Sequence, residues 1–235
     1  MLNYAHRGAS SYAPENTWPA FELGIELNAN GIETDVRKTK DGVLVLFHDD
    51  SLKRIVEVEG GVEDYTYGQL LEFDFGLFKG EQYRGEKIVS MEGFLSRYAR
   101  KDLSLAIELK EKGIELDVCR MLEDKRVPSY IVTSFDYSQL LEVRRNDSSI
   151  KIGYLTDCFS REMVDKLVRD KVNEICPKAE LLIPSMCTYA HKSGLSIRAW
   201  GVKDYDLMVH CCLCGVDGMT VNFPDLLDAY LKRLC

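Results

Sequence analysis

The chain has 235 residues, of which 46% are hydrophobic and 29% are charged. This composition is typical of a globular protein and excludes a disordered or collagen-like chain. The formal net charge of −8 disfavours nucleic-acid binding, which needs a basic surface, but it permits a small anionic substrate because a bound cation can reverse the local field.

Short β-branched segments alternate with longer helical patterns along the chain, which is typical of repeated βαβ units. We predict nine strands, at residues 2–5, 31–35, 43–47, 103–108, 130–134, 151–154, 173–176, 196–200 and 217–220. The clearest helical patterns lie at residues 17–27, 137–146, 161–170, 204–214 and 225–234.

The connection between the second and third predicted strands, residues 36–42, is too short for a parallel crossover, which needs about a dozen residues. We therefore expect an antiparallel hairpin here, with Lys40, Asp41 and Gly42 forming the turn. Eight parallel strands remain, so the sequence predicts an α/β fold, a (β/α)8 TIM barrel. We expect residues 1–235 to form one barrel domain.

Residues 50–92 fit the alternation poorly, because they carry several glycines among many aromatic residues. We interpret this segment as an insertion that packs near the barrel mouth. A mobile linker is the alternative, but the segment is too apolar for a solvated tether.

Polar residues follow several of the predicted strands, at the barrel end where active sites of this fold lie. Glu33 and Asp35 are one residue apart, so their carboxylates project to the same face of a strand. Glu108 ends another strand and adds a third oxygen ligand, a set that favours Mg²⁺ or Ca²⁺. The alternative is that these acids are strand-end charges paired with Arg7 or Lys110.

Two histidines share this position: His6 follows the first strand, and His48 ends the return strand of the hairpin. The hairpin would bring His48 beside Glu33 and Asp35, so that one imidazole could accept a proton and the other deliver one. By contrast, we expect His191 and His210, in helical segments, to have structural roles.

The eight cysteines include Cys211, Cys212 and Cys214 in one predicted helix. We expect reduced thiols in a cytoplasmic protein, because a zinc site would need a second cluster of ligands.

We also expect no secretory signal and no membrane insertion. The first residues lack a basic segment before an apolar run, and no stretch approaches a membrane span.

Taken together, the ordered motifs resemble the glycerophosphodiester phosphodiesterase family. They are His6-Arg7-Gly8, Pro14-Glu15-Asn16-Thr17, Ala20-Phe21, Gly31-Ile32-Glu33-Thr34-Asp35-Val36, Thr39-Lys40-Asp41-Gly42, His48-Asp49 followed by Leu52 and Arg54, Ile107-Glu108-Leu109-Lys110, Ser134-Phe135, Ala199-Trp200 and Gly215-Val216-Asp217-Gly218-Met219. The resemblance spans nearly the whole chain.

The resemblance implies a TIM barrel that hydrolyses a small glycerophosphodiester to an alcohol and glycerol 3-phosphate. It implies one divalent cation on Glu33, Asp35 and Glu108, with His6 as base and His48 as acid. By the same resemblance, Arg7 and Lys110 would contact the phosphate, and Trp200 would form an aromatic wall of the pocket.

The sequence departs from the family pattern after Trp200, where Gly201-Val202-Lys203 follows, and before Pro224, where Val221-Asn222-Phe223 precedes. We expect both departures to leave the metal and the histidines untouched and to affect recognition of the alcohol half of the substrate.

Two rival functions stay open: a lipid phosphodiesterase related to phospholipase D, and a catalytically silent barrel that binds a ligand. The choice between Mg²⁺ and Ca²⁺, the head group and the oligomeric state also stay open.

Overall fold

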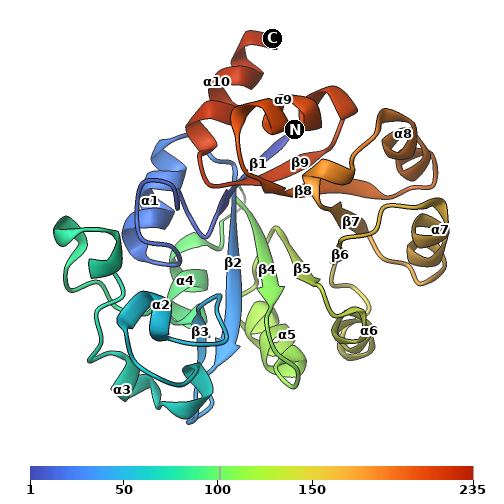
Figure 1. Ribbon diagram of the computed structural model, residues 1–235. Helices are drawn as coiled ribbons and strands as arrows, with labels where there is room; N and C mark the ends of the chain where they lie inside the picture. The colour runs from blue at the N-terminus through green and yellow to red at the C-terminus, as the bar shows by residue number, and fades with distance from the viewer. Residues whose placement is uncertain (101, 235) are drawn as a thin grey trace.

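A computed structural model of the chain describes residues 1–100 and 102–234. Eight parallel strands form a closed barrel in the order β1-β9-β8-β7-β6-β5-β4-β2, and the β1–β2 pairing closes it (Figure 1). The TIM-barrel prediction is therefore confirmed. The strands are β1 (Leu2–His6), β2 (Gly31–Lys38), β4 (Ser104–Leu109), β5 (Tyr130–Ser134), β6 (Ile152–Thr156), β7 (Glu174–Pro177), β8 (Ser196–Val202) and β9 (Gly218–Val221).

The ninth strand, β3 (Leu44–Leu46), pairs antiparallel with the end of β2, with Val36 opposite Leu46. Gly42 has φ of +86° in the connecting turn, a conformation that side chains with a Cβ atom rarely adopt. Its backbone N–H donates to the carbonyl of Thr39 at 2.9 Å. The predicted hairpin is confirmed, and it returns the chain toward the barrel rim.

Helices surround the barrel, and their polar caps match the local sequence. For example, Ser160 accepts a hydrogen bond from the backbone of Met163 at 3.2 Å, and Gly215 ends α9 with φ of +78°. The principal helices are α1 (Trp18–Glu26), α4 (Met91–Tyr98), α5 (Glu115–Asp124), α6 (Tyr137–Asn146), α7 (Arg161–Arg169), α8 (Pro184–Lys192), α9 (Tyr205–Cys214) and α10 (Pro224–Leu234).

The predicted insertion forms a compact unit beside β3 rather than a mobile linker (Figure 1). It contains α2 (Lys53–Val56), α3 (Tyr67–Leu70) and the 3₁₀ turns η1 (Val62–Asp64), η2 (Leu77–Lys79) and η3 (Glu81–Tyr83). A separate hydrophobic core holds it, made of Val45, Phe47, Leu52, Ile55, Val62, Leu70, Phe75 and Ile88. The segment ends where α4 begins, at Met91, and α4 packs into the main core.

The barrel interior is unusually polar beneath the rim, where branched apolar residues ordinarily dominate. Arg198 is 1% exposed, and its Nε donates to Glu174 at 3.0 Å while its Nη1 donates to Thr220 at 2.7 Å. This buried ion pair forms the floor under the site at the strand ends.

Among the described residues, no helix combines the length and apolar character needed to cross a bilayer.

Candidate active site

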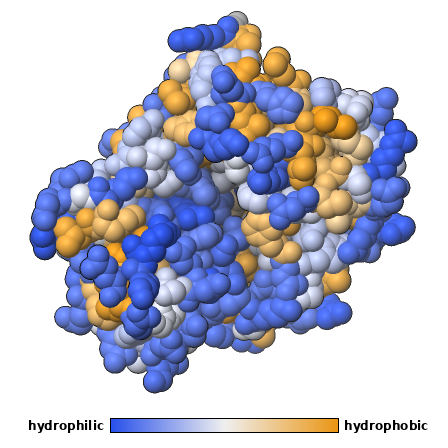
Figure 2. Space-filling view, in the orientation of Figure 1, coloured by the Kyte–Doolittle hydropathy of each residue, from blue (hydrophilic) through white to orange (hydrophobic). Residues whose placement is uncertain are grey.

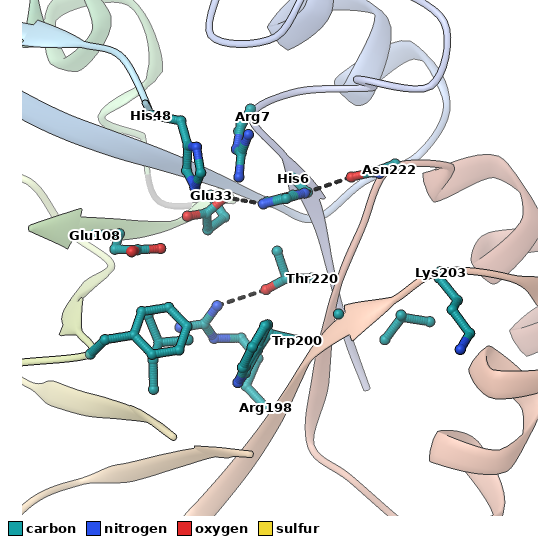
Figure 3. A pocket seen from close by; sticks show the side chains of 14 residues that line it. His6, Arg7, Glu33, His48, Glu108, Arg198, Trp200, Lys203, Thr220 and Asn222 are labelled. Atoms are coloured by element: carbon teal, nitrogen blue, oxygen red, sulfur yellow. Dashed lines mark hydrogen bonds and ion pairs between the residues drawn. The ribbon is translucent and has the colours of Figure 1, made fainter. Parts of the chain in front are cut away.

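A cavity of about 330 Å³ opens at the carboxyl ends of the strands. It appears in Figure 2 as a hollow with mainly hydrophilic residues around it and hydrophobic ones along one side. Figure 3 shows side chains from β1, β2, β4 and β8 converging on it. The lining residues that carry charge or an aromatic ring are His6, Arg7, Glu33, His48, Glu108, Phe135, Arg198, Trp200 and Lys203.

Three buried carboxylates lie at the inner side of this cavity. Asp35 on β2 pairs in register with Glu108 on β4, and Glu33 lies two residues before Asp35 on the same strand face. One oxygen from each of Glu33, Asp35 and Glu108 falls within 4.8 Å of the others. The strand register therefore brings together the three acids that the sequence singled out.

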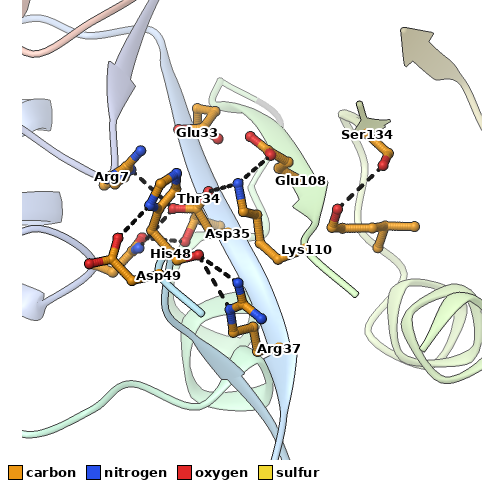
Figure 4. A network of polar contacts seen from close by, with 12 residues as sticks. Arg7, Glu33, Thr34, Asp35, Arg37, His48, Asp49, Glu108, Lys110 and Ser134 are labelled. Atoms are coloured by element: carbon orange, nitrogen blue, oxygen red, sulfur yellow. Dashed lines mark hydrogen bonds and ion pairs between the residues drawn. The ribbon is translucent and has the colours of Figure 1, made fainter. Parts of the chain in front are cut away.

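Two cations partly balance these acids. Arg7 Nε lies 3.1 Å from Asp35 Oδ2, while Lys110 Nζ lies 2.8 Å from Glu108 Oε1 and 3.9 Å from Asp35 Oδ1 (Figure 4). Burial raises the pKa of Glu33 well above its usual value, and the charges of Asp35 and Glu108 add to the effect. Burial opposes ionisation of Asp35 too, but Arg7 and other nearby cations outweigh it and lower the pKa of that carboxyl.

The carboxylates leave two buried oxygens without a hydrogen-bond partner, Glu33 Oε2 and Asp35 Oδ1. Unpaired buried carboxylate oxygens are costly unless an ion or another donor reaches them. Three acids at this spacing, two of them with an unpartnered oxygen, fit a hard divalent cation, whose preferred ligands are oxygen atoms. The residues present therefore suit the cation that the resemblance implies.

A tight turn directs Arg7 back over the acids. Arg7 and Gly8 both adopt positive φ, at 55° and 84°. A Cβ atom at Gly8 would lie 2.4 Å from the backbone carbon of Ala20, so only glycine fits at this contact. The backbone of the His6-Arg7-Gly8 motif thus sets the direction of the Arg7 side chain.

His6 points into the cavity, with Nδ1 bonded to a neighbouring side chain (Figure 3). Its Nδ1 lies 2.6 Å from Asn222 Oδ1, and its Nε2 lies 3.8 Å from Glu33 Oε2. Burial, followed by the positive charge of Arg7, lowers the pKa of His6 to about 4. The ring is therefore neutral near pH 7, as a proton acceptor must be.

His48 also lines the cavity, and its Nδ1 is 2.7 Å from Asp49 Oδ1 (Figure 4). Burial lowers its pKa, while the charge of Asp35 and the hydrogen bond to Asp49 act in the opposite direction. Its backbone carbonyl accepts hydrogen bonds from the buried guanidinium of Arg37, at 2.9 Å from Nη2 and 3.3 Å from Nε. Both the ring and the backbone of His48 are thus fixed.

Aromatic residues form the side of the cavity away from the acids. The rings of Trp200 and Phe135 meet edge to face with centroids 4.9 Å apart. Trp200 Nε1 is buried without a hydrogen-bond acceptor, so this wall offers one donor to a bound molecule.

Sequence reasoning missed the contact of Asn222 with His6. We expected the departure before Pro224 to leave the histidines untouched, but Asn222 lies in that segment and bonds the imidazole directly, so this expectation is wrong. Asn16, which belongs to the Pro14-Glu15-Asn16-Thr17 motif, also contacts one of the acids: its amide donates to Asp35 at 3.0 Å and accepts from Thr34 at 2.7 Å. A polar residue directly after a strand was the available signal for Asn222.

The remaining histidines lie away from the cavity. His191 Nε2 lies 2.8 Å from Asp217 Oδ2, and His210 Nε2 lies 3.0 Å from the carbonyl of Leu182. Both make helix-to-loop contacts, as expected for structural residues.

Comparison with known proteins agrees with this geometry. A family model described as the Glycerophosphoryl diester phosphodiesterase family matches residues 6–226. The putative glycerophosphodiester phosphodiesterase YhdW of Bacillus subtilis is 36% identical over 236 residues, which cover 97% of this chain and 96% of that protein. A glycerophosphodiester phosphodiesterase of Caldanaerobacter subterraneus is 32% identical, covering 99% and 98%.

Solved structures show the same fold. An Oleispira antarctica phosphodiesterase in complex with the product sn-glycerol-3-phosphate superposes with a TM-score of 0.89 at 23% identity, covering 99% of this chain and 97% of that one. A glycerophosphodiester phosphodiesterase from Thermotoga maritima gives a TM-score of 0.82 at 26% identity, covering 99% and 98%.

Proposed function

The chain belongs to the glycerophosphoryl diester phosphodiesterase family, and from that premise we propose that it hydrolyses small glycerophosphodiesters to an alcohol and glycerol 3-phosphate with a divalent cation and two histidines. The enzyme class, a glycerophosphodiester phosphodiesterase, follows from the family. The observation that carries the finer proposal is the set of three buried carboxylates, two of them with unpaired oxygens, at a cavity that two imidazoles also line.

A phosphodiester anion repels nucleophiles, so its charge has to be balanced first. Glu33, Asp35 and Glu108 would hold one Mg²⁺ or Ca²⁺, which when bound would withdraw charge from the phosphate through a nonbridging oxygen. The guanidinium of Arg7, which lines the cavity, would donate to phosphate oxygens as a planar fork. Lys110, bonded to Glu108, would add positive charge from beside the acids.

Proton transfer would be divided between the histidines. With Nδ1 directed at the amide oxygen of Asn222, His6 keeps an unprotonated Nε2 toward the cavity. That atom would take the proton from the nucleophile, either water or the 2-hydroxyl of the substrate's own glycerol. His48, whose protonated ring Asp49 stabilises, would give a proton to the departing alkoxide.

Trp200 and Phe135 would border the organic part of the substrate, opposite the charged side of the cavity.

We further propose that the chain acts as one barrel domain in a reducing, cytoplasmic compartment. The free thiols of the described cysteines support the second point, since disulfides are typical of oxidising compartments.

The test is product analysis with glycerophosphocholine and glycerophosphoethanolamine, in the presence of Mg²⁺ or Ca²⁺. We expect glycerol 3-phosphate and free alcohol in equal amounts, and none after chelation. Phosphocholine with free glycerol would indicate cleavage of the other bond. Cleavage of lysophospholipids alone would favour the lipid enzyme, and no release from any diester would favour a binding protein.

A further inference from the structure

Arg54, on helix α2 of the insertion, binds two carboxylates at once. Toward Asp49, its Nε donates to Oδ2 at 2.6 Å and its Nη2 to Oδ1 at 3.1 Å. Toward Glu15, its Nη1 donates to Oε2 at 2.9 Å and its Nη2 to Oε1 at 2.8 Å. The guanidinium therefore makes a two-point contact with each acid, the geometry that gives arginine pairs their directional specificity.

Each of these acids also supports a residue of the candidate site. Glu15 Oε1 accepts from Arg7 Nη1 at 2.9 Å, and Asp49 Oδ1 lies 2.7 Å from His48 Nδ1. A continuous series of charged contacts thus runs around one side of the cavity. In order, it is Arg7, Glu15, Arg54, Asp49 and His48.

We propose that Arg54 is a positioning residue that fixes the distance between Arg7 and His48 and their relative orientation. The side chain that binds the phosphate and the side chain that transfers the proton then face the same bound substrate. The inference rests on the roles proposed above for Arg7 and His48. It also assigns a purpose to the insertion, which supplies Arg54.

The contacts of Arg54 exclude direct substrate binding. A guanidinium has five N–H donors, and four of them are used in the bonds to Asp49 and Glu15. Two carboxylates neutralise its single charge, and the side chain does not line the cavity. Arg54 therefore acts through its two partners.

The insertion core holds Arg54 in place. The next residue, Ile55, is 5% exposed in this core, and Leu52 at the start of α2 is fully buried. Phe47, which precedes His48, packs into the same core. Both ends of the Arg54–Asp49–His48 contact are thus attached to one packed unit.

Electrostatics keep both partner acids ionised. Burial opposes ionisation, but the hydrogen bonds from Arg54 and then His48 outweigh it and lower the pKa of Asp49 to about 2. The pKa of Glu15 is lowered as well, because Arg54 and Arg7 outweigh the effect of burial. Since Arg54 is 47% exposed, these pairs contribute little to global stability, and alignment is the larger effect.

The test compares Arg54→Ala and Arg54→Lys with wild type and with Lys53→Ala. Lys53 is the matched control, because it is the preceding residue on α2 and makes only an exposed pair with Glu59. We expect each Arg54 variant to lose about 10- to 100-fold in kcat/KM, as a misalignment of about 1 Å does. The midpoint of thermal unfolding should stay close to that of wild type, and Lys53→Ala should keep full activity.

Two further readouts separate positioning from a general structural effect. Added guanidinium ion should partly restore Arg54→Ala, because it can occupy the vacated site between the two acids. Combining Arg54→Ala with Asp49→Asn should cost little more than the larger single loss, since both break one series of contacts.

Wild-type kcat/KM in Arg54→Lys would overturn the proposal, because the lysine keeps the charge and lacks only the two-point geometry. An equal loss in Lys53→Ala would overturn it too. If Arg54→Ala unfolds, Arg54→Lys decides alone. His48→Ala, measured in parallel, distinguishes a failure of the positioning role from a failure of the proposed function. If His48→Ala is inactive while Arg54→Lys is fully active, positioning by Arg54 is refuted and the proposed function still holds.

Discussion

His6 Nδ1 lies 2.6 Å from Asn222 Oδ1, although 216 residues separate the two in the chain. An amide oxygen only accepts hydrogen bonds, so this contact places the imidazole proton on Nδ1 and leaves Nε2 free to accept one. Strands β1 and β9 pair in parallel, and His6 and Asn222 directly follow the paired residues Ala5 and Val221. The pairing of β1 with β9 therefore sets the tautomer of His6.

Replacing either histidine should stop the chemistry without disturbing the fold. We expect His6→Ala and His48→Ala each to lower kcat by about 10²- to 10⁴-fold, the range that general acid–base groups contribute. Neither ring is part of a hydrophobic core, so thermal unfolding should change little. Steady-state kinetics and calorimetry on the same samples check both points, and substantial activity in either variant contradicts the acid–base scheme.

Binding of a divalent cation should both activate and stabilise the protein. At about 100 times its Kd, a cation should add about 2.7 kcal/mol to the free energy of unfolding. Glu108→Gln should weaken this stabilisation, while Asp117→Asn, at a half-buried acid that pairs with Lys38 outside the cavity, should not. Thermal unfolding at a series of Mg²⁺ or Ca²⁺ concentrations measures the effect. Full activity after exhaustive chelation rules out the metal.

The stability contributed by Asp49 should depend on pH in a defined direction. Hydrogen bonds from Arg54 and His48 lower the folded-state pKa of Asp49 to about 2, from its ordinary value of 3.8. A lowered pKa stabilises the fold above the unfolded value, and this stability is lost as the pH falls through the folded value. The difference in unfolding free energy between wild type and Asp49→Asn should therefore be constant above about pH 5 and shrink toward pH 2. Urea unfolding across this range tests the sign; a difference that grows on acidification contradicts it.

The ion pair in the barrel interior should be costly to break from one side. Arg198→Met leaves Glu174, which is 7% exposed, without its cation, and should destabilise the protein by about 3–5 kcal/mol. The double variant Arg198→Met/Glu174→Leu should recover most of that loss, since no buried charge stays unpaired. Urea unfolding of the single and double variants gives the comparison. Equal instability in both would show that packing, not charge, dominates.

The barrel could be predicted from sequence because its signals are local. β-Branched strands, their spacing and the short connection before Gly42 each lie within a few residues, and together they gave the strand number and the hairpin. The acids could be placed for the same reason, since Glu33 and Asp35 alternate on one strand. Helices α4, α5 and α8 were not among the predicted helical patterns, although they complete the same alternation.

The residues that support the site could not be predicted in the same way. Asn222 contacts His6 across 216 residues, and Arg54 contacts Glu15 across 39. Such contacts depend on strand register and on the packing of the insertion, which no local pattern specifies. The sequence motifs contained Glu15, Asp49 and Arg54, but only the folded chain shows that Arg54 joins the two acids.

The central claim, that three acids hold one cation beside the phosphate in this cavity, is tested most directly by a crystal structure with Ca²⁺ and glycerol 3-phosphate. We predict one cation within about 2.3–2.6 Å of oxygens from Glu33, Asp35 and Glu108 and of a phosphate oxygen, with the glycerol between the acids and Trp200. A cation bound elsewhere, or a phosphate outside the reach of Arg7 and both histidines, would contradict the account.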